Sequence, residues 1–387
     1  MAIITIIGAG MMGSALAFPA RENGHEVRLV RTHLDRHVIA HCRQTGSHPK
    51  FDRPFPAGVK FYDVEEADSA ISGCHFVICG VSSFGVEWFS ENMLPRIPET
   101  TPVLAVTKGL LDLPDGTVKT FPDYWRKEAG KRGRKPDINA IGGPCTSYEL
   151  VAHDHSHVTF CGRNPETLRF LKSCLSTDYY HISLSTDVTG VECAVALKNG
   201  YALGVALSIG ANRKVFGDDT LHYNSQAALF GQSVEEMRRL LRLFCGNDAA
   251  LSVGAGDLYV TVYGGRTRLV GILLGEGLTI DEALERLQGV TLESLVISKR
   301  VYAALRRRSA EEEIAARFPL LAHVSKLIAG EQTPIPWDAF TSEKFNRKGE
   351  YLWIGFLIRS FWQGTAANAP SFRKTRFLLS AMRFRAA

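Results

Sequence analysis

The chain has 387 residues, a length that suggests two domains with sizeable hydrophobic cores. Its hydrophobic content of 45% and charged content of 22% are those of an ordinary soluble globular protein. The net charge of +5 suits small anionic ligands such as phosphates, and it is too mild to demand a nucleic acid as partner.

The cysteines and the first residues indicate the compartment. The eight cysteines form no C-x-x-C motif and no His/Cys cluster at metal-ligand spacing, so we expect free thiols and no metal site. Residues 1–20 lack the basic stretch of a targeting peptide. No apolar stretch reaches the ~18 residues of a membrane span. We therefore expect a cytoplasmic protein without a transmembrane segment.

A β-branched apolar run, Ala2–Ile7, is typical of a strand buried on both faces of a parallel sheet. The sequence GAGMMG follows at once, and a helical run, Ser14–Asn23, comes next. A strand, a G-x-G-x-x-G turn and a helix in this order indicate a dinucleotide site, whose pyrophosphate lies on the turn and the helix N-terminus. The alternative is a glycine-rich turn in another α/β fold. The candidate cofactor-binding residues are Gly8, Gly10, Met11, Met12 and Gly13.

The end of the second predicted strand, Glu26–Val30, bears on the choice of cofactor. NAD-specific sites often place Asp or Glu here for the ribose 2′-OH, whereas this chain has Arg31. A guanidinium can hold the 2′-phosphate of NADP or stack on adenine. We therefore expect NAD or NADP, with a slight preference for NADP.

Further strand-like runs alternate with helical segments, which predicts an α/β fold with a doubly wound, mostly parallel sheet. Ligands bind at the carboxyl ends of such strands. Ser82 lies in a turn after one strand and is placed to touch the cofactor. Lys108 follows another strand and is a candidate substrate-site cation, although a surface lysine is the commoner case. The runs are Val59–Tyr62, Phe76–Cys79, Pro102–Val106, Ile138–Ile141, Val158–Cys161 and Tyr180–Leu184.

Two segments of this half have alternative interpretations. Lys119–Lys135 is polar and basic, and we expect a solvated excursion rather than a patch for nucleic acid. Cys145 lies in a turn that follows the strand Ile138–Ile141. Its thiol suggests a nucleophile, but no motif places a base beside it, so we favour a small residue that lines a pocket.

From Asp187 onward the apolar period is helical. Val191–Ala211 is apolar all round, which predicts a buried helix with one cation, Lys198, near its middle. A buried lysine costs several kcal/mol unless it is paired or loses its proton, so Lys198 is a candidate acid/base. A lysine that reaches water at the helix edge is the alternative. Further predicted helices are Tyr223–Leu229, Val234–Phe244, Ile280–Leu287 and Leu292–Leu305.

A glycine-rich stretch between these helices adds an acid and a phosphate-binding group. Asp257 lies in apolar surroundings and is placed to pair with Lys198. The sequence Gly264-Gly265-Arg266 offers backbone N–H groups beside a guanidinium, which suits a phosphate. A salt bridge that links two domains is the alternative role for Asp257 and for Arg266.

Together these motifs resemble the NAD(P)-dependent glycerol-3-phosphate dehydrogenases. The similarity covers about residues 1–305 through GAGMMG, VTKG, GGPCTSYE, VALKN, GAGDLYVTVYGGRTR and, more weakly, VTLES. It implies a Rossmann-type domain followed by an all-α domain, and a homodimer. It also implies that the enzyme interconverts dihydroxyacetone phosphate and glycerol 3-phosphate by hydride transfer.

The resemblance assigns roles to individual residues. Lys198 is the acid/base on the reacting oxygen, Asp257 holds or tunes it, and Lys108 belongs to the same catalytic group. Arg266 clamps the substrate phosphate and contacts the cofactor. The other substrate-site residues are Gly143, Cys145, Asn199, Thr261 and Thr267. The other cofactor-site residues are Ser82, Lys108, Ser147 and Glu293.

The chain departs from the family pattern at three positions. It has Thr267 in place of Asn, Cys145 in place of Ser or Thr, and Ser82 in place of Pro. These departures keep open a longer phosphorylated polyol or ketose as substrate. A dehydrogenase of opines or keto acids is a rival function, against which Arg266 and the VALKN motif argue. A non-catalytic NAD(P)-binding regulatory protein is another, and the retained acid/base set disfavours it.

We expect three parts of the chain. Residues 1–186 form the dinucleotide-binding domain, and residues 187–330 form the helical substrate and catalytic domain. Residues 331–387 lie outside the resemblance. We expect them to pack as an extra helix on the helical domain or on a second subunit. Their mixture of apolar and basic residues also suits peripheral contact with an anionic membrane surface.

Overall fold

The computed structural model describes residues 1–217, 222–264, 267–288 and 293–341. Met1–Pro336 form one compact unit, and Trp337 begins a second, of which helix α17 (Trp337–Phe340) is described. The extra helix and the membrane contact expected near the end of the chain fall mainly on residues 342–387, outside the described residues. The division of the chain at residues 186 and 330 stays a prediction.

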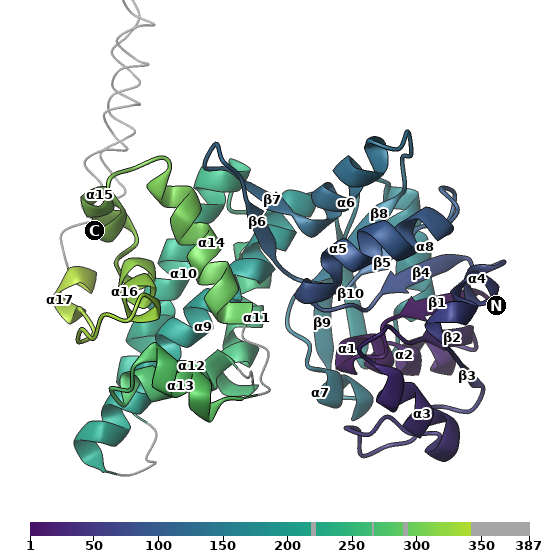
Figure 1. The fold of residues 1–387 in the computed structure, drawn as a ribbon, viewed down its shortest axis with the longest axis horizontal. Helices are drawn as coiled ribbons and strands as arrows, with labels where there is room; N and C mark the ends of the chain where they lie inside the picture. The colour runs from purple at the N-terminus through teal and green to yellow at the C-terminus, as the bar shows by residue number, and fades with distance from the viewer. Residues whose placement is uncertain (218–221, 265–266, 289–292, 342–387) are drawn as a thin grey trace, which may run out of the picture. The chain divides into compact units, whose positions relative to one another are not determined.

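The first half is built on an eight-stranded sheet in the order β10-β9-β8-β5-β4-β1-β2-β3 (Figure 1). Neighbouring strands are parallel except β8 and β9. Every strand predicted from the sequence belongs to this sheet. Its strands are β1 (Ile3–Ile7), β2 (Glu26–Val30), β3 (Val59–Tyr62), β4 (Phe76–Cys79), β5 (Val103–Ala105), β8 (Ile138–Gly142), β9 (Ser156–Cys161) and β10 (Tyr180–Ser185).

Helices cover both faces of the sheet, which confirms the predicted doubly wound α/β fold. On one face Ile4 and Ile6 of β1 share a hydrophobic core with Phe18 of α2. On the other face Thr5 Oγ1 donates a hydrogen bond to the Ala70 carbonyl of α4, at 2.5 Å. The helices of this half are α1 (Met11–Ala15), α2 (Ala17–Glu22), α3 (Arg36–Thr45), α4 (Ala67–Ile71), α5 (Val86–Trp88), α6 (Phe121–Gly130), α7 (Ser147–Val151) and α8 (Pro165–Leu175).

The prediction of a solvated excursion over Lys119–Lys135 is wrong. An antiparallel hairpin of β6 (Leu110–Asp112) and β7 (Val118–Thr120) leads into α6. Phe121 and Trp125 of this helix are buried, and the Trp125 indole donates a hydrogen bond to the Val86 carbonyl at 2.9 Å. The many charged residues of the segment suggest a loop, but the segment forms an amphipathic helix. The side chains of Phe121 and Trp125 lie on its buried face.

The second half is helical, as the sequence predicts, and is arranged around the 29-residue helix α9 (Figure 1). The two helices expected over Tyr223–Leu229 and Val234–Phe244 are one continuous helix, α10. The helices are α9 (Val188–Phe216), α10 (Tyr223–Cys245), α11 (Leu251–Gly264), α12 (Thr267–Gly275), α13 (Ile280–Arg286), α14 (Glu293–Arg306), α15 (Glu311–Arg317) and α16 (Pro319–Ile328).

Helix α11 was not expected, because its glycines suggest a loop. The structure gives one of them a packing role. A Cβ atom on Gly254 would lie 2.9 Å from the Ala194 carbonyl oxygen of α9. The absence of a side chain lets α11 approach α9 closely, and this approach brings Asp257 against α9.

Helix α9 also corrects the expectation about apolar length. By length and hydropathy it is able to cross a membrane, but 94% of its apolar window is buried inside the protein. A core helix of a globular domain passes the same test, because it too is apolar on every side. The apolar character of α9 is therefore explained by burial between α10, α11, α12 and α14, which all pack on it.

Candidate active site

The glycine-rich turn joins β1 to α1 beside the end of β4. Gly8 has a φ of +111°, and a Cβ there would lie 2.7 Å from the Gly80 carbonyl carbon. At Gly10 the nearest atom to such a Cβ would be the Gly80 oxygen, at 3.8 Å, so the space above this residue is open. Gly8 and Gly80 thus bring the turn close to the end of β4, whereas Gly10 leaves room for a ligand. This arrangement fits a pyrophosphate. Met11 and Met12 begin α1 at the same place.

The turn lies where the order of the sheet reverses, because the chain runs outward from β1 in both directions. Such switch points are the usual ligand sites of doubly wound sheets. The loop after β4 reaches across to the helical half, where Ser83 Oγ donates a hydrogen bond to Glu293 Oε1 at 3.0 Å. Ser82, the predicted cofactor contact, is the residue before Ser83 and precedes a short helical turn.

Arg31 is engaged by neighbouring carboxylates rather than turned to open space. Its guanidinium forms ion pairs with Asp63 and, at 3.0 Å, with Glu65. A pocket of about 670 Å³ adjoins this cluster, lined by Arg31, Arg36, Ala40, Arg43, Asp63, Glu65 and Glu66. In the arrangement observed, both anions compete with any 2′-phosphate for the guanidinium of Arg31.

A cluster of two lysines and one carboxylate lies between the two halves of the chain. Lys198 Nζ donates hydrogen bonds to Asp257 Oδ1 at 2.9 Å and to Thr261 Oγ1 at 2.8 Å. Lys108 Nζ binds the other oxygen of Asp257 and the Gly143 carbonyl, the latter at 3.1 Å. The contact between Lys198 and Asp257 is the one expected from the sequence. That between Lys108 and Asp257 was not expected.

The environment of Lys198 lowers the pKa of its ammonium group. Burial is the largest cause, because it penalises the charged form, and the positive charge of Lys108 acts in the same direction. Asp257 opposes both effects and favours the protonated amine. A lysine with a lowered pKa, held by two acceptors, is suited to exchange a proton with a ligand.

The turn after β8 places Gly143, Cys145 and Ser147 beside this cluster. Gly143 has a φ of +114°, and its carbonyl accepts the Lys108 hydrogen bond described above. Burial raises the pKa of the Cys145 thiol to about 11, so the sulfur is protonated at neutral pH. This environment favours the pocket-lining role over the nucleophile. Ser147 is buried at the start of α7.

Two further predicted substrate contacts lie on the helical half. Asn199 is buried beside Lys198, and its side-chain amide makes no hydrogen bond within the described part of the chain. Thr267 is buried at the first position of α12. Arg266, the predicted phosphate clamp, lies outside the described residues.

Sequence inspection missed a buried acid in α9. Glu192 is fully buried, and neither of its carboxyl oxygens has a hydrogen-bond partner among the described residues. Burial raises the pKa of this carboxyl group to about 8. The only signal in the sequence was a glutamate within an apolar helix, one helical turn and a half before Lys198.

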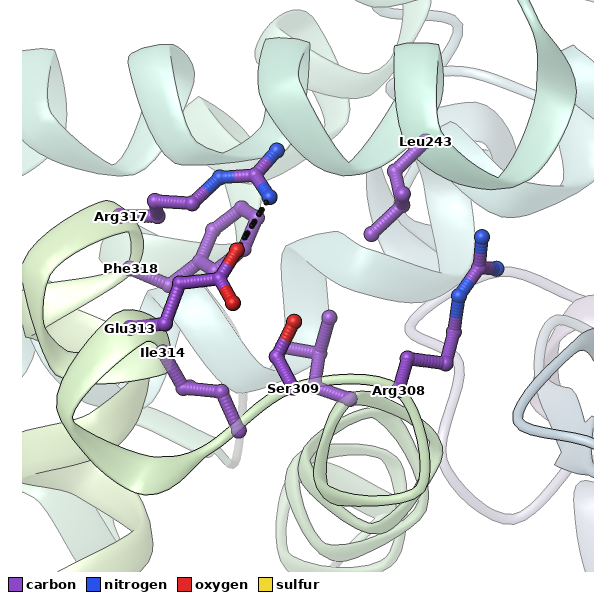
Figure 2. Close-up of a pocket in the computed structure, with 8 residues that line it drawn as sticks. Leu243, Arg308, Ser309, Glu313, Ile314, Arg317 and Phe318 are labelled. Carbon is purple, nitrogen blue, oxygen red and sulfur yellow. Dashed lines mark hydrogen bonds and ion pairs between the residues drawn. The ribbon is translucent and has the colours of Figure 1, made fainter.

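A second pocket, of about 220 Å³, lies between α10, the end of α14 and α15 (Figure 2). Leu243 and Ser309 point toward its interior, and Glu313 and Arg317 form an ion pair of 3.1 Å at its side. None of the predicted site residues lines it. The candidate active site is therefore the cluster around Asp257 together with the glycine-rich turn.

Two family models match the chain. The model of the NAD-dependent glycerol-3-phosphate dehydrogenase N-terminus matches residues 3–168. The model of the NAD-dependent glycerol-3-phosphate dehydrogenase C-terminus matches residues 187–337. The two matches together cover most of Met1–Pro336, the compact unit that contains the site.

Curated relatives agree with the family models. The NADP(+)-dependent glycerol-3-phosphate dehydrogenase of Archaeoglobus fulgidus is 32% identical over 289 residues, which are 74% of this chain and 84% of that protein. The NAD(P)+ glycerol-3-phosphate dehydrogenase of Shouchella clausii is 26% identical over 303 residues, which are 77% of this chain and 85% of that protein.

Solved structures show the same architecture. The glycerol-3-phosphate dehydrogenase of Coxiella burnetii has a TM-score of 0.71 at 25% identity, over 89% of this chain and 99% of that chain. The glycerol-3-phosphate dehydrogenase of Plasmodium falciparum has a TM-score of 0.75 over 89% of this chain and 97% of that chain. At 19% identity, the latter supports the fold alone.

Proposed function

Because the chain belongs to the NAD-dependent glycerol-3-phosphate dehydrogenase family, we propose that it interconverts dihydroxyacetone phosphate and glycerol 3-phosphate, with NAD or NADP as hydride carrier. The observation that carries this proposal is the position of Lys198. Its amine is held by Asp257 and Thr261 and lies between the helical half and the strand ends of the sheet.

The reaction requires one hydride and one proton. When bound, the reduced nicotinamide supplies the hydride to the carbonyl carbon of the ketose phosphate. Lys198 donates the proton to the carbonyl oxygen, which becomes the hydroxyl of glycerol 3-phosphate. In the reverse direction the neutral amine of Lys198 accepts the hydroxyl proton.

Asp257 and Lys108 prepare Lys198 for this transfer. Asp257 fixes the direction of the Lys198 amine and stabilises its charged form. Lys108 neutralises the second oxygen of Asp257 and adds positive charge near the reacting oxygen, where negative charge develops. Thr261 accepts the second hydrogen bond of the Lys198 amine and helps to hold the amine in place.

The remaining contacts hold the two ligands. Asn199 offers an uncommitted amide beside Lys198 for a substrate hydroxyl. Arg266 and the backbone near it bind the substrate phosphate, a role that rests on the family resemblance. The glycine-rich turn would hold the cofactor pyrophosphate. Glu293, which the family resemblance assigns to the cofactor site, accepts a hydrogen bond from Ser83 in the loop after β4.

An initial-rate assay tests the proposed function. Oxidation of NADH and of NADPH is followed with dihydroxyacetone phosphate, and four-, five- and six-carbon ketose phosphates are run beside it. We expect saturable turnover of the three-carbon substrate. Faster turnover of a longer ketose phosphate would assign a different substrate to the same chemistry, and cofactor binding without any turnover would favour a regulatory protein.

We further propose a homodimer located in the cytoplasm. The dimer is supported by the family resemblance. The cytoplasmic location is supported by the eight cysteines, which all lie in the described residues and are unpaired, as in a reducing compartment. Light scattering at two protein concentrations tests the first, and fractionation of cells that produce the protein tests the second.

A further inference from the structure

Asp35 is bound to the glycine-rich turn instead of to its own helix. It occupies the N-cap position of α3, where an aspartate normally accepts a hydrogen bond from the first helical turn, but it makes no such bond. Its Oδ2 atom accepts hydrogen bonds from the Ala9 backbone at 3.0 Å and from the Thr32 backbone at 3.3 Å. The Thr32 hydroxyl donates a further bond to the same oxygen at 2.9 Å.

These three donors fix one carboxylate oxygen and leave the other available. Asp35 Oδ1 makes no hydrogen bond within the described part of the chain, and the side chain is partly exposed. No ion pair to a described residue neutralises this carboxylate, since Arg31 is committed to Asp63 and Glu65. Asp35 therefore presents an oriented, negatively charged acceptor at the carboxyl ends of β1 and β2.

This is the place where the adenosine ribose lies in a site of this type. A carboxylate at the end of the second strand usually accepts the hydrogen bond of the ribose 2′-OH. In this chain the residue at the end of the second strand is Arg31. Asp35 nevertheless places a carboxylate beside the glycine-rich turn, where it accepts a hydrogen bond from the backbone N–H of Ala9. An ionised carboxylate accepts hydrogen bonds from hydroxyl groups and repels a phosphate.

We infer that Asp35 binds the ribose hydroxyls of the cofactor's adenosine and that its charge disfavours a 2′-phosphate at the same position. Asp35 takes over the role of the acid that is missing at the end of β2, with Thr32 as its positioning residue. The inference rests on the proposed use of NAD or NADP. It names Asp35 as the residue that sets the preference between NAD and NADP. Arg31 does not set this preference in the conformation observed, because it is paired with Asp63 and Glu65.

The test measures binding of cofactor fragments rather than turnover. The full chain is titrated by calorimetry with 5′-AMP and with adenosine 2′,5′-bisphosphate, which differs by the 2′-phosphate. In Asp35→Asn we expect the affinity for 5′-AMP to fall about tenfold, because a hydrogen bond to a charged acceptor is lost. The affinity for the bisphosphate should stay constant or rise, because a repulsive charge is removed.

The ratio of the two affinities separates this role from a structural one. If Asp35 only supports the glycine-rich turn, both affinities fall by the same factor and the inference is overturned. An unchanged affinity for 5′-AMP overturns it as well. Asp68→Asn is the control, because it removes the same charge from an exposed carboxylate, 74% accessible, and should leave the ratio unchanged.

A second pair of variants keeps the test decisive if Asp35→Asn does not fold. Thr32→Val removes the hydroxyl that orients Asp35, while Thr32→Ser retains it. We expect the first to shift the affinity ratio in the same direction as Asp35→Asn, and the second to behave as the natural chain. Equal ratios in both variants would contradict the inference. Failure of turnover with normal 5′-AMP binding would count against the proposed function alone.

Discussion

Lys108 and Lys198 bind opposite oxygens of a single carboxylate, that of Asp257, although they come from different halves of the chain. One anion thus serves two cations in a mostly buried site. Asp257 is 3% accessible, Lys198 13% and Lys108 19%. Because both lysines bind the same carboxylate, the charge of Lys108 acts on the pKa of Lys198.

The first prediction concerns Lys198. Replacing it with Ala should lower kcat by about 10²- to 10⁴-fold, the usual contribution of a general acid, while the Kd of NADH changes little. The measurement is steady-state kinetics with dihydroxyacetone phosphate, combined with a fluorescence titration of NADH. Lys172→Ala, an exposed lysine of α8, is the matched control and should keep full activity. Equal losses of kcat and of cofactor affinity would remove Lys198 from the chemical step.

The second prediction uses the pH dependence of ketose reduction. Lys198 must be protonated to donate a proton, so kcat/KM falls as the pH rises through its pKa. Asp257 raises this pKa and Lys108 lowers it. The alkaline limb should therefore move to lower pH in Asp257→Asn and to higher pH in Lys108→Met.

Measured pH profiles of kcat/KM decide this prediction, and the directions matter more than the size of the rate losses. A limb that moves the same way in both variants would show that Asp257 and Lys108 do not act on Lys198 through their charges. The exposed Lys172→Ala variant should reproduce the natural profile.

The third prediction concerns stability and the buried Glu192. Its pKa is raised from 4.5 to about 8, so the folded state holds the proton more tightly than the unfolded chain. Below pH 4.5 both states are protonated and the group has no effect. Between pH 4.5 and 8 the unfolded chain ionises first, and the folded protein loses stability by roughly 5 kcal/mol at most.

Glu192→Gln removes this loss because the amide does not ionise. The variant should gain free energy of unfolding relative to the natural chain as the pH rises from 5 to 9, and the gain should vanish toward pH 4.5. Urea unfolding at several pH values measures it. Glu166→Gln, an exposed glutamate of α8, is the control and should show no such trend. A difference independent of pH would mean that Glu192 is ionised in the folded protein.

The fourth prediction concerns the Cys145 thiol. With a pKa raised to about 11, roughly one molecule in a thousand carries the reactive thiolate at pH 8. Alkylation by iodoacetamide should therefore be at least about tenfold slower than that of glutathione under the same conditions, since the stronger nucleophilicity of a high-pKa thiolate offsets only part of the low thiolate fraction. Peptide mapping by mass spectrometry follows the reaction. Rapid alkylation of Cys145 with loss of activity would reinstate the nucleophile.

The strands and the glycine-rich turn could be predicted because their signals are local. A β-branched run such as Ala2–Ile7 indicates a strand of a parallel sheet that is covered on both faces. Residues 119–135 and 251–264 were misinterpreted for opposite reasons. Charged residues concealed the buried aromatics of α6, and glycines that allow close packing of α11 on α9 resembled a loop.

The sequence by itself determined that a buried lysine had to be neutralised and that a dinucleotide turn follows the first strand. These conclusions depend on the cost of burying a charge and on backbone geometry, which both act within a few residues. Only the tertiary structure decided which groups meet. Asp257 lies 149 residues from Lys108 and accepts its hydrogen bond, and Asp35 reaches Ala9 across 26 residues. Contacts of this kind depend on how helices and strands pack. The period of the apolar residues predicts which side chains are buried, but it does not predict which residues contact them.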